Sequence, residues 1–377
     1  MSLHLQANLP STNGEWGATP GDPNVVELTT QSGETTHMWC CEPELLRSTD
    51  VDVTDTVLVA MRRSMRKAKV AVPEAFPKPT IDILYTHGRL EDISFRAVRR
   101  FLAMLAIQFN VNCYIFEWPG FHFSTGSPTP DSIVEAGEAA FKYLCDKNSN
   151  GIILMGHSIG CGAVLQMATS GIAPASGLLR GVAMRAPMTS VCGILCPSSM
   201  CCCCAEAAHR SCCRCGGWRA LADSCDAVRN IDLIEHVACP VFIMHSKADE
   251  LIPYQHSQLL AAECEDCTLW WMEREPPYKH PDHPTKGARL HPEFVQLFAA
   301  FLDRCGGALE GSGLASAEVK FTVSDEASGE VEAPEHRGFG RRLSSEGASA
   351  HHEMGGTAGS STVDVGEETS LLHNKLH

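Results

Sequence analysis

A serine stands between two glycines at the end of a short apolar run, in "GIILMGHSIGCGAVLQ" (residues 151–166). The G-x-S-x-G spacing is typical of a nucleophilic serine held at a sharp turn between a strand and a helix. Glycines flank such a turn because larger side chains there would collide with the strand and the helix. Ser158 is therefore the candidate nucleophile, and the alternative interpretation is an ordinary loop serine.

A serine hydroxyl attacks a carbonyl readily only when a histidine takes its proton and a carboxylate orients that histidine. In chains with this turn, the acid and then the histidine follow the serine. Asp249 is the candidate acid because it comes just after the apolar run in "CPVFIMHSKADELIP", and the carboxyl ends of parallel strands share one edge of a sheet. A solvated loop acid remains the alternative. Other downstream acids fit less well because none comes first after a strong strand: Asp223, Asp226, Asp232 and Glu250.

The candidate base lies in "EPPYKHPDHPTKGARLHPEF" (residues 275–294), which contains three histidines. Counting back from the final helix favours His283, whereas counting forward from the preceding strand favours His280. His291 adjoins the start of that helix and comes too late in the chain. We expect His283 to be the base, with His280 as the alternative.

The negative charge that develops on the attacked carbonyl oxygen needs two backbone N–H groups. Ile159 is the first candidate donor because it follows the nucleophile at a helix N-terminus, where the helix dipole favours negative charge. The second donor is expected near Arg89, in the loop after "ILYTHG". We interpret His87 and Gly88 as structural, with the glycine allowing the loop to approach closely. This chemistry requires no cofactor and no metal.

The elements that position these residues alternate between strands and helices. Strands are expected at 24–30, 50–63, 80–88, 111–120, 151–156, 181–187, 239–245 and 267–273, and helices at 95–109, 130–147, 159–170 and 291–305. The helix at 130–147 is expected to have Asp131 or Ser132 as its N-cap. The alternation predicts an α/β fold with a doubly wound, mostly parallel sheet and helices on both faces.

Composition sets the domain organisation and excludes some partners. Hydrophobic residues make up 44% and charged residues 20%, which suits a globular core, and the net charge of −15 argues against nucleic acid. We expect a flexible lead-in (1–23), a catalytic domain (24–305) and a disordered Gly- and Ser-rich tail (306–377). The sequence shows no signal peptide and no apolar stretch of membrane-span length, so we expect the chain in the reducing cell interior.

Ten of the nineteen cysteines lie between Cys192 and Cys225, inside a segment (188–230) that we expect to be a lid insertion. One interpretation is S-acylation, which anchors a protein stably when two or more chains are attached. A second is a structural zinc site of four thiolates, with or without His209, although the spacing fits only loosely. A third is a compact lid that the cysteines merely fill. The acylation candidates are Cys201, Cys202, Cys203, Cys204, Cys212, Cys213 and Cys215.

Four segments together resemble one branch of the α/β-hydrolases, the serine depalmitoylases that remove palmitate from cysteines of membrane-attached proteins. They are "ILYTHG", "IFEWPGFHFSTGSP", "IILMGHSIGCGAV" and "PVFIMHSKADELIPYQHSQLL", and the resemblance covers residues 82–302. It implies the α/β-hydrolase fold, Ser158 as nucleophile, Asp249 as acid, and His283 or His280 as base.

The chain departs from that group at several positions. Arg89 stands where the group has Asn, Ser246 replaces a glycine before the acid, and His122 replaces a glycine of the aromatic turn. The histidine loop is longer and lacks the group's Gly-His-Asn run. The group's N-terminal cysteine cluster is reduced here to Cys40 and Cys41, and the dense cluster lies downstream instead.

The resemblance implies a palmitoyl-protein thioesterase that acts at the cytoplasmic side of membranes, with acylated cysteines contacting the membrane surface. The residues alone are compatible with any long acyl ester, so a lipid esterase such as a monoacylglycerol or lysophospholipid lipase is the alternative. The irregular histidine loop motivates another class, a membrane-bound adaptor that has lost catalysis.

Overall fold

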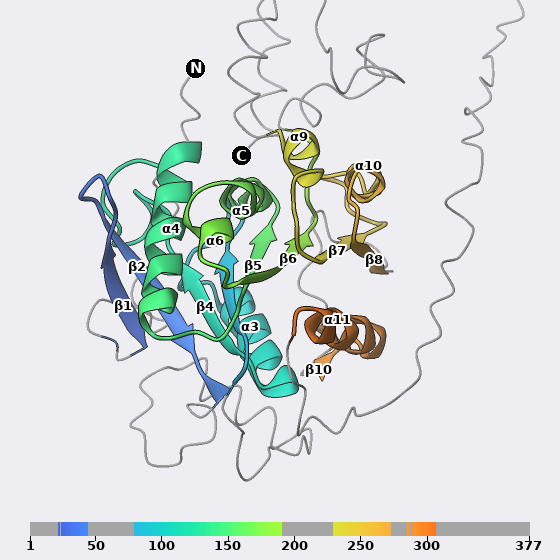
Figure 1. Cartoon of the computed structure of the whole chain (residues 1–377), viewed down its shortest axis with the longest axis horizontal. Coiled ribbons are helices and arrows are strands. Elements are labelled where there is room, and N and C mark those ends of the chain that lie inside the picture. Colours follow the sequence, from blue (N-terminus) through green and yellow to red (C-terminus); the bar gives the residue numbers. More distant parts are fainter. Residues whose placement is uncertain are drawn as a thin grey trace, which may run out of the picture. The chain divides into compact units, whose positions relative to one another are not determined.

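The computed structural model describes residues 22, 24–43, 79–190, 229–272, 285–286 and 289–306. Its main feature is an eight-stranded sheet in the order β1-β2-β4-β3-β5-β6-β7-β8 (Figure 1). The strands are β1 (Val25–Thr29), β2 (Thr35–Cys41), β3 (Asp82–Thr86), β4 (Asn112–Phe116), β5 (Ile152–His157), β6 (Leu179–Arg185), β7 (Val241–Ser246) and β8 (Cys267–Met272). A separate two-stranded sheet pairs β9 (Thr285–Lys286) with β10 (Arg289–Leu290).

Strands β3 to β8 all run parallel, so their carboxyl ends share one edge of the sheet. Only β1 and β2 are antiparallel to their neighbours among the strands of this sheet. The prediction of a mostly parallel sheet is therefore confirmed. Strand β2 was not predicted, and it forms a hairpin with β1 through a turn in which Gly33 has a φ of 88°. We call the two sides of the sheet the carboxyl edge and the amino edge, after the ends of β3 to β8.

Helices cover both faces of the sheet, as a doubly wound fold requires (Figure 1). One core cluster contains α3, α11 and side chains such as Ile83 of β3, and the other contains α4, α5 and the neighbouring Leu84. This split follows from the strand geometry, because successive side chains point to opposite faces. The helices are α3 (Arg96–Phe109), α4 (Pro130–Asp146), α5 (Gly160–Thr169), α6 (Ile172–Ala175), α9 (Asn230–Ile234), α10 (Gln255–Ala262) and α11 (Pro292–Arg304).

The start of α4 corrects one prediction. The N-cap is Thr129 rather than Asp131 or Ser132, and its Oγ1 accepts the backbone N–H of Ser132 at 3.1 Å. The Ser132 Oγ in turn accepts the N–H of Thr129 at 2.8 Å, which completes a capping box. The reason is Pro130, which suits the first helical position because that position needs no N–H donor.

Several predictions fall on residues that the structure does not describe. They are the strand at 50–63, nearly all of the lead-in (1–23), most of the cysteine-rich segment (188–230) and nearly all of the tail (306–377). The domain boundaries therefore stay predictions. Within the described parts of the chain, no helix has both the length and the apolar character needed to cross a bilayer.

Candidate active site

Ser158 occupies a turn between β5 and α5, as the glycine spacing predicted. A Cβ atom added to Gly156 would lie 2.8 Å from the Cα of Cys161, and one added to Gly160 would lie 2.5 Å from the carbonyl oxygen of His87. Both contacts are with backbone, which cannot move aside cheaply. Strand, helix and the loop after β3 can therefore pack this tightly only because both positions are glycine.

The Ser158 backbone has a left-handed conformation, with a φ of 55°. Its N–H donates to the carbonyl oxygen of Arg185 at 2.9 Å, at the end of the neighbouring strand β6. Ala186, which directly follows β6, also has a positive φ of 46°, and its N–H donates to the carbonyl of Met244 in β7. Such backbone conformations cost about 1–3 kcal/mol each for residues other than glycine and cluster at functional sites.

Asp249 follows β7 by three residues, and its carboxylate is fixed by hydrogen bonds. Its Oδ1 accepts the backbone N–H groups of Leu251 and Ile252, each at 2.9 Å, and its side chain is fully buried. A buried carboxylate with two backbone donors is not the solvated loop acid of the alternative interpretation. It is a rigidly held acceptor, and its second oxygen, Oδ2, takes no part in these two hydrogen bonds.

His245 lies near this acid but is unsuited to be the base. Its Nε2 is 3.5 Å from Asp249 Oδ2. However, the same nitrogen lies 2.9 Å from the carbonyl oxygen of Ile252, and Nδ1 lies 2.6 Å from the hydroxyl of Ser257. The ring is fully buried, so both nitrogens are committed within the β7–α10 region. His245 therefore helps to hold the acid in place.

Ser158 and Asp249 share the carboxyl edge of the sheet. Ser158 follows β5, Asp249 follows β7, and β6 lies between them. Two strand spacings amount to about 10 Å between the backbones of β5 and β7.

The predicted base lies in the part of the chain that the structure does not describe. His283 and the alternative His280 are both within residues 273–284. The chain enters this segment from Met272, which pairs with Ser246 at the carboxyl end of β7. The segment therefore starts at the edge that carries Asp249. His291, which is not a candidate for the base, is the N-cap of α11, and its ring lies 5.6 Å from that of Trp270.

The two predicted oxyanion donors, Ile159 and Arg89, lie on the two segments that meet where Gly88 approaches His157. Ile159 is the N-cap of α5, so its N–H lies outside the hydrogen bonds of that helix. Arg89 follows Gly88, and a Cβ on that glycine would lie 2.8 Å from Nδ1 of His157. The loop after β3 thus touches the residue that precedes the nucleophile. The Gly88 N–H is occupied by a carboxylate oxygen of Glu91 at 2.8 Å, so an oxyanion donor from this loop must be a later residue.

His87 is fully buried beneath this loop. Its Nδ1 donates to the Gly88 carbonyl at 2.8 Å, and its Nε2 lies 2.9 Å from Glu117 Oε1. Complete burial favours the neutral ring, but the hydrogen bond and the charge of Glu117 outweigh it and raise the pKa of His87. Two acceptors facing the two ring nitrogens agree with that direction. The pair holds the start of the loop rigidly, in agreement with the structural role expected for His87.

Sequence reasoning missed three buried charged residues at this edge: Glu91, Glu117 and Arg185. One signal was present in "GVAMRAP", where an arginine ends an otherwise apolar strand. A charge in such a place needs a buried partner. The partner, Glu91, comes from a distant loop, and no local pattern identifies it.

The seven cysteines predicted to be acylated, Cys201 to Cys204, Cys212, Cys213 and Cys215, lie outside the described residues. The two ends of their segment are nevertheless held together. The N–H of Ile231 donates to the Thr189 carbonyl at 3.1 Å, and the side chain of Asn230 donates to the Met188 carbonyl at 2.7 Å. Thr189 follows β6, so the segment is inserted at the carboxyl edge of the sheet.

The described cysteines are free thiols. Burial raises the pKa of Cys161, in α5, to about 12, so that thiol is protonated and packs as a small hydrophobic side chain. Within the described ranges, no group of three or more His, Cys, Asp or Glu is arranged to hold a metal ion.

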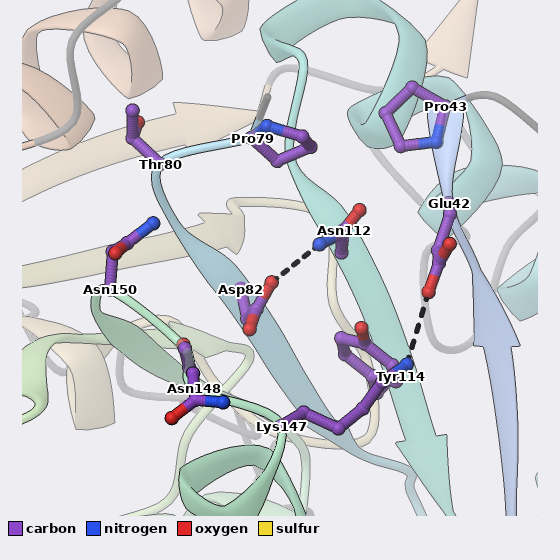
Figure 2. A pocket seen from close by; sticks show the side chains of 11 residues that line it. Glu42, Pro43, Pro79, Thr80, Asp82, Asn112, Tyr114, Lys147, Asn148 and Asn150 are labelled. Atoms are coloured by element: carbon purple, nitrogen blue, oxygen red, sulfur yellow. Dashed lines mark hydrogen bonds and ion pairs between the residues drawn. The ribbon is translucent and has the colours of Figure 1, made fainter. Parts of the chain in front are cut away.

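A pocket of about 290 Å³ lies beside the amino ends of the parallel strands (Figure 2). Its lining includes Asp82 and Asn112, the first residues of β3 and β4, and Lys147 beyond α4. None of the predicted site residues lines it. This pocket therefore lies at the amino edge, away from Ser158.

Comparisons with known proteins agree with this architecture. Residues 68–175 match a family described as Chlamydia CHLPS protein (DUF818). The chain is 24% identical over 263 residues to the alpha/beta hydrolase domain-containing protein aho-3 of Caenorhabditis elegans, covering 67% of this chain and 68% of that protein. It is 24% identical over 251 residues to alpha/beta hydrolase domain-containing protein 17B of Homo sapiens, covering 65% and 77%.

Solved esterases were also found to be similar. The esterase Pf2001 of Pyrococcus furiosus is 13% identical, with a TM-score of 0.48 over 74% of this chain and 89% of that one. Est1E of Butyrivibrio proteoclasticus is 13% identical, with a TM-score of 0.45 over 75% and 99%. The strand order, the serine turn and the similarity to alpha/beta hydrolase domain-containing proteins together identify the fold as that of the α/β-hydrolases.

Proposed function

We propose that the chain is a serine hydrolase of ester or thioester bonds. The left-handed turn at Ser158, at the same sheet edge as the immobilised carboxylate of Asp249, is the observation that carries the proposal. Relatives named as alpha/beta hydrolases and similar structures named as esterases agree with it.

In the proposed reaction, Ser158 Oγ attacks the carbonyl carbon and a histidine accepts its proton. The same histidine then protonates the leaving thiol or alcohol as the carbonyl–sulfur or carbonyl–oxygen bond breaks. Water hydrolyses the acyl-enzyme and regenerates the hydroxyl. Asp249 orients the histidine, which is His283 or, as the alternative, His280. The backbone N–H groups of Ile159 and Arg89 stabilise the oxyanion.

The preferred substrate is a palmitoylated protein. The resemblance to serine depalmitoylases supports this choice, and so does the surface around the site. Among the described residues, the three most exposed large apolar side chains lie in loops at the carboxyl edge: Leu90 (65% exposed), Phe123 (47%) and Leu251 (46%). Exposed apolar side chains beside a hydrolytic site suit a long acyl chain.

S-acylation of the cysteine-rich segment would hold the chain at the cytoplasmic side of a membrane. Its ends meet at Thr189 and Ile231, so acyl chains on it would turn the edge that carries Ser158 toward the bilayer. Metabolic labelling with an alkyne palmitate analogue tests this. We expect a hydroxylamine-sensitive label that is lost when the seven candidate cysteines are changed to serine. A stoichiometric zinc signal without label would instead support the zinc site.

Labelling with a fluorophosphonate probe tests the hydrolase itself. We expect the purified full chain to react, Ser158→Ala to be silent, and the variant of the true base (His283→Ala or His280→Ala) to react much more slowly. The other histidine variant is then the matched control. A folded wild-type chain that does not react would support the catalytically inactive adaptor.

Substrate choice is tested by comparing release of palmitate from an S-palmitoylated peptide and from monoacylglycerol. We expect the wild-type chain to prefer the thioester and Ser158→Ala to hydrolyse neither. A preference for monoacylglycerol would favour the lipid esterase instead.

A further inference from the structure

Glu91 is a buried carboxylate at the carboxyl edge that has no part in the reaction proposed above. It lies three residues after Gly88 in the loop that follows β3, and its side chain is 8% exposed. Residues of three different strand ends point donors at it. Such convergence is unusual for a loop acid and calls for a specific role.

The contacts divide between the two carboxylate oxygens. Oε2 accepts the backbone N–H of Gly88 at 2.8 Å and lies 2.8 Å from Nδ1 of His157. Oε1 accepts from Nη2 of Arg185 at 3.0 Å. The three partners follow or end β3, β5 and β6, which are neighbours in the sheet.

Each of these three partners is covalently linked or hydrogen-bonded to a residue that takes part in the proposed reaction. Gly88 precedes Arg89, the predicted oxyanion donor, and His157 precedes Ser158. The carbonyl oxygen of Arg185 accepts the N–H of Ser158 at 2.9 Å. The Glu91 carboxylate therefore joins the oxyanion loop to the residue before Ser158 and to the end of β6, whose carbonyl holds the Ser158 N–H.

Neutralising a buried arginine is the simpler explanation for Glu91. Arg185 is 2% exposed, and a buried guanidinium requires a partner. That requirement is met by the contact at Oε1 alone. It does not explain why Oε2 holds Gly88 and His157, which are the contacts that reach the oxyanion loop and the serine turn.

We infer that Glu91 is a positioning residue that holds the Gly88–Arg89 loop against the Ser158 turn during hydrolysis. The inference rests on the proposed function. Oxyanion donors are effective because they are aimed before charge develops, and a misplacement of about 1 Å can cost about 100-fold in rate. Glu91 fixes that aim without touching the substrate.

The test uses Glu91→Gln in the full chain, with a p-nitrophenyl fatty acyl ester as substrate. Titration with a fluorophosphonate counts the reactive serines, so that kcat is expressed per reactive site. We expect kcat per site to fall about 10- to 100-fold, while KM changes by less than about 3-fold. The reason is that the carbonyl of the bound substrate carries little negative charge for the oxyanion donors to stabilise before the reaction. A purely structural role would reduce the number of titrated sites and leave kcat per site unchanged.

Asp82→Asn is the matched control, because it replaces a buried carboxylate at the amino edge (Figure 2). We expect its kcat per site to equal that of the wild type. If Glu91→Gln does not fold, Glu91→Asp retains the charge opposite Arg185 but withdraws the carboxylate by one methylene. We then expect the same fall in kcat.

Two failures are distinguishable. A wild-type chain that does not react with the fluorophosphonate overturns the proposed function, and the inference falls with it. A reactive wild type whose Glu91 variants retain kcat within about 2-fold overturns the inference alone.

Discussion

The two edges of the sheet bury acids in different ways. At the carboxyl edge, Glu91 and Asp249 each accept hydrogen bonds from at least two backbone or side-chain donors of other residues. At the amino edge, Asp82 lines a pocket, accepts from the side chain of Asn112 at 2.7 Å and is also hydrogen-bonded by Ser149 (Figure 2). Among these three acids, only Glu91 contacts residues at the carboxyl ends of three neighbouring strands.

Backbone conformation separates the edges further. Asn110 and Asn148, which follow α3 and α4, have positive φ angles, and asparagine adopts this conformation with little penalty. At the carboxyl edge, the same conformation is imposed on Ser158 and Ala186. Backbone strain and the convergent contacts of Glu91 therefore coincide at one edge, which is where we place the reaction.

The largest expected effect is the difference between Asp249→Asn and Asp82→Asn. An amide at position 249 cannot hold the imidazolium that forms during attack, so we expect kcat to fall about 10³- to 10⁴-fold. An amide at position 82 should change kcat by less than about 2-fold. Steady-state hydrolysis of a p-nitrophenyl ester measures both, and similar losses in the two variants would contradict the functional difference between the two edges.

Gly160→Ala tests the tight packing of the serine turn. The added Cβ would lie 2.5 Å from the His87 carbonyl oxygen and 2.9 Å from that of Thr86. We expect a loss of about 1–3 kcal/mol in the free energy of unfolding, because the backbone must shift. Since the shift separates the loop from the turn, the fluorophosphonate rate should fall at least about 10-fold.

Gly177→Ala is the control for that variant. Gly177 also has a positive φ, of 67°, but an added Cβ there would meet nothing within 4 Å. We expect a stability loss of about 1 kcal/mol from backbone strain and no change in the fluorophosphonate rate. Urea unfolding and labelling kinetics measure the two quantities, and a normal rate in Gly160→Ala would contradict the packing argument.

Much of the fold was predictable because it follows from local patterns. Buried strands such as β5 read as continuous apolar runs, and the glycines around Ser158 mark the turn because their absence of a Cβ is a local requirement. Strand β2 was missed because its partner in the sheet, β4, pairs with it across 72 to 78 residues of sequence, which no local pattern reveals.

The site was only partly predictable for the same reason. The serine and the acid follow strong strands, so their sheet edge could be inferred. Glu91 contacts His157 and Arg185, which lie 66 and 94 residues away, and a loop glutamate has no distinguishing pattern. The choice between His283 and His280 stays a prediction, because both lie outside the described residues.

The buried pair of His87 and Glu117 should make stability depend on pH. Although burial opposes the charge, Glu117 raises the pKa of His87 above 6.5. The stability that the pair contributes is therefore complete below the unfolded pKa of about 6.5 and is lost as pH rises through the higher folded pKa. Urea unfolding from about pH 6 to pH 9 measures this decline. In Glu117→Gln the decline should largely disappear, and an unchanged decline would contradict the assignment.

The smallest effect is expected at Asp82. Burial raises its pKa, although hydrogen bonds with Ser149 and Asn112 oppose the shift. A carboxyl group with a raised folded pKa favours the folded state most when protonated, so its contribution declines as pH rises from about 3.8 through the folded pKa.

Asn retains an acceptor for Asn112 but carries no charge to desolvate. Asp82→Asn should therefore unfold with a free energy up to about 1 kcal/mol higher than the wild type at neutral pH. The advantage should vanish below about pH 4. A variant that is much less stable at neutral pH would mean that the ionised acid stabilises the amino edge, and the contrast between the two edges would then lose its electrostatic basis.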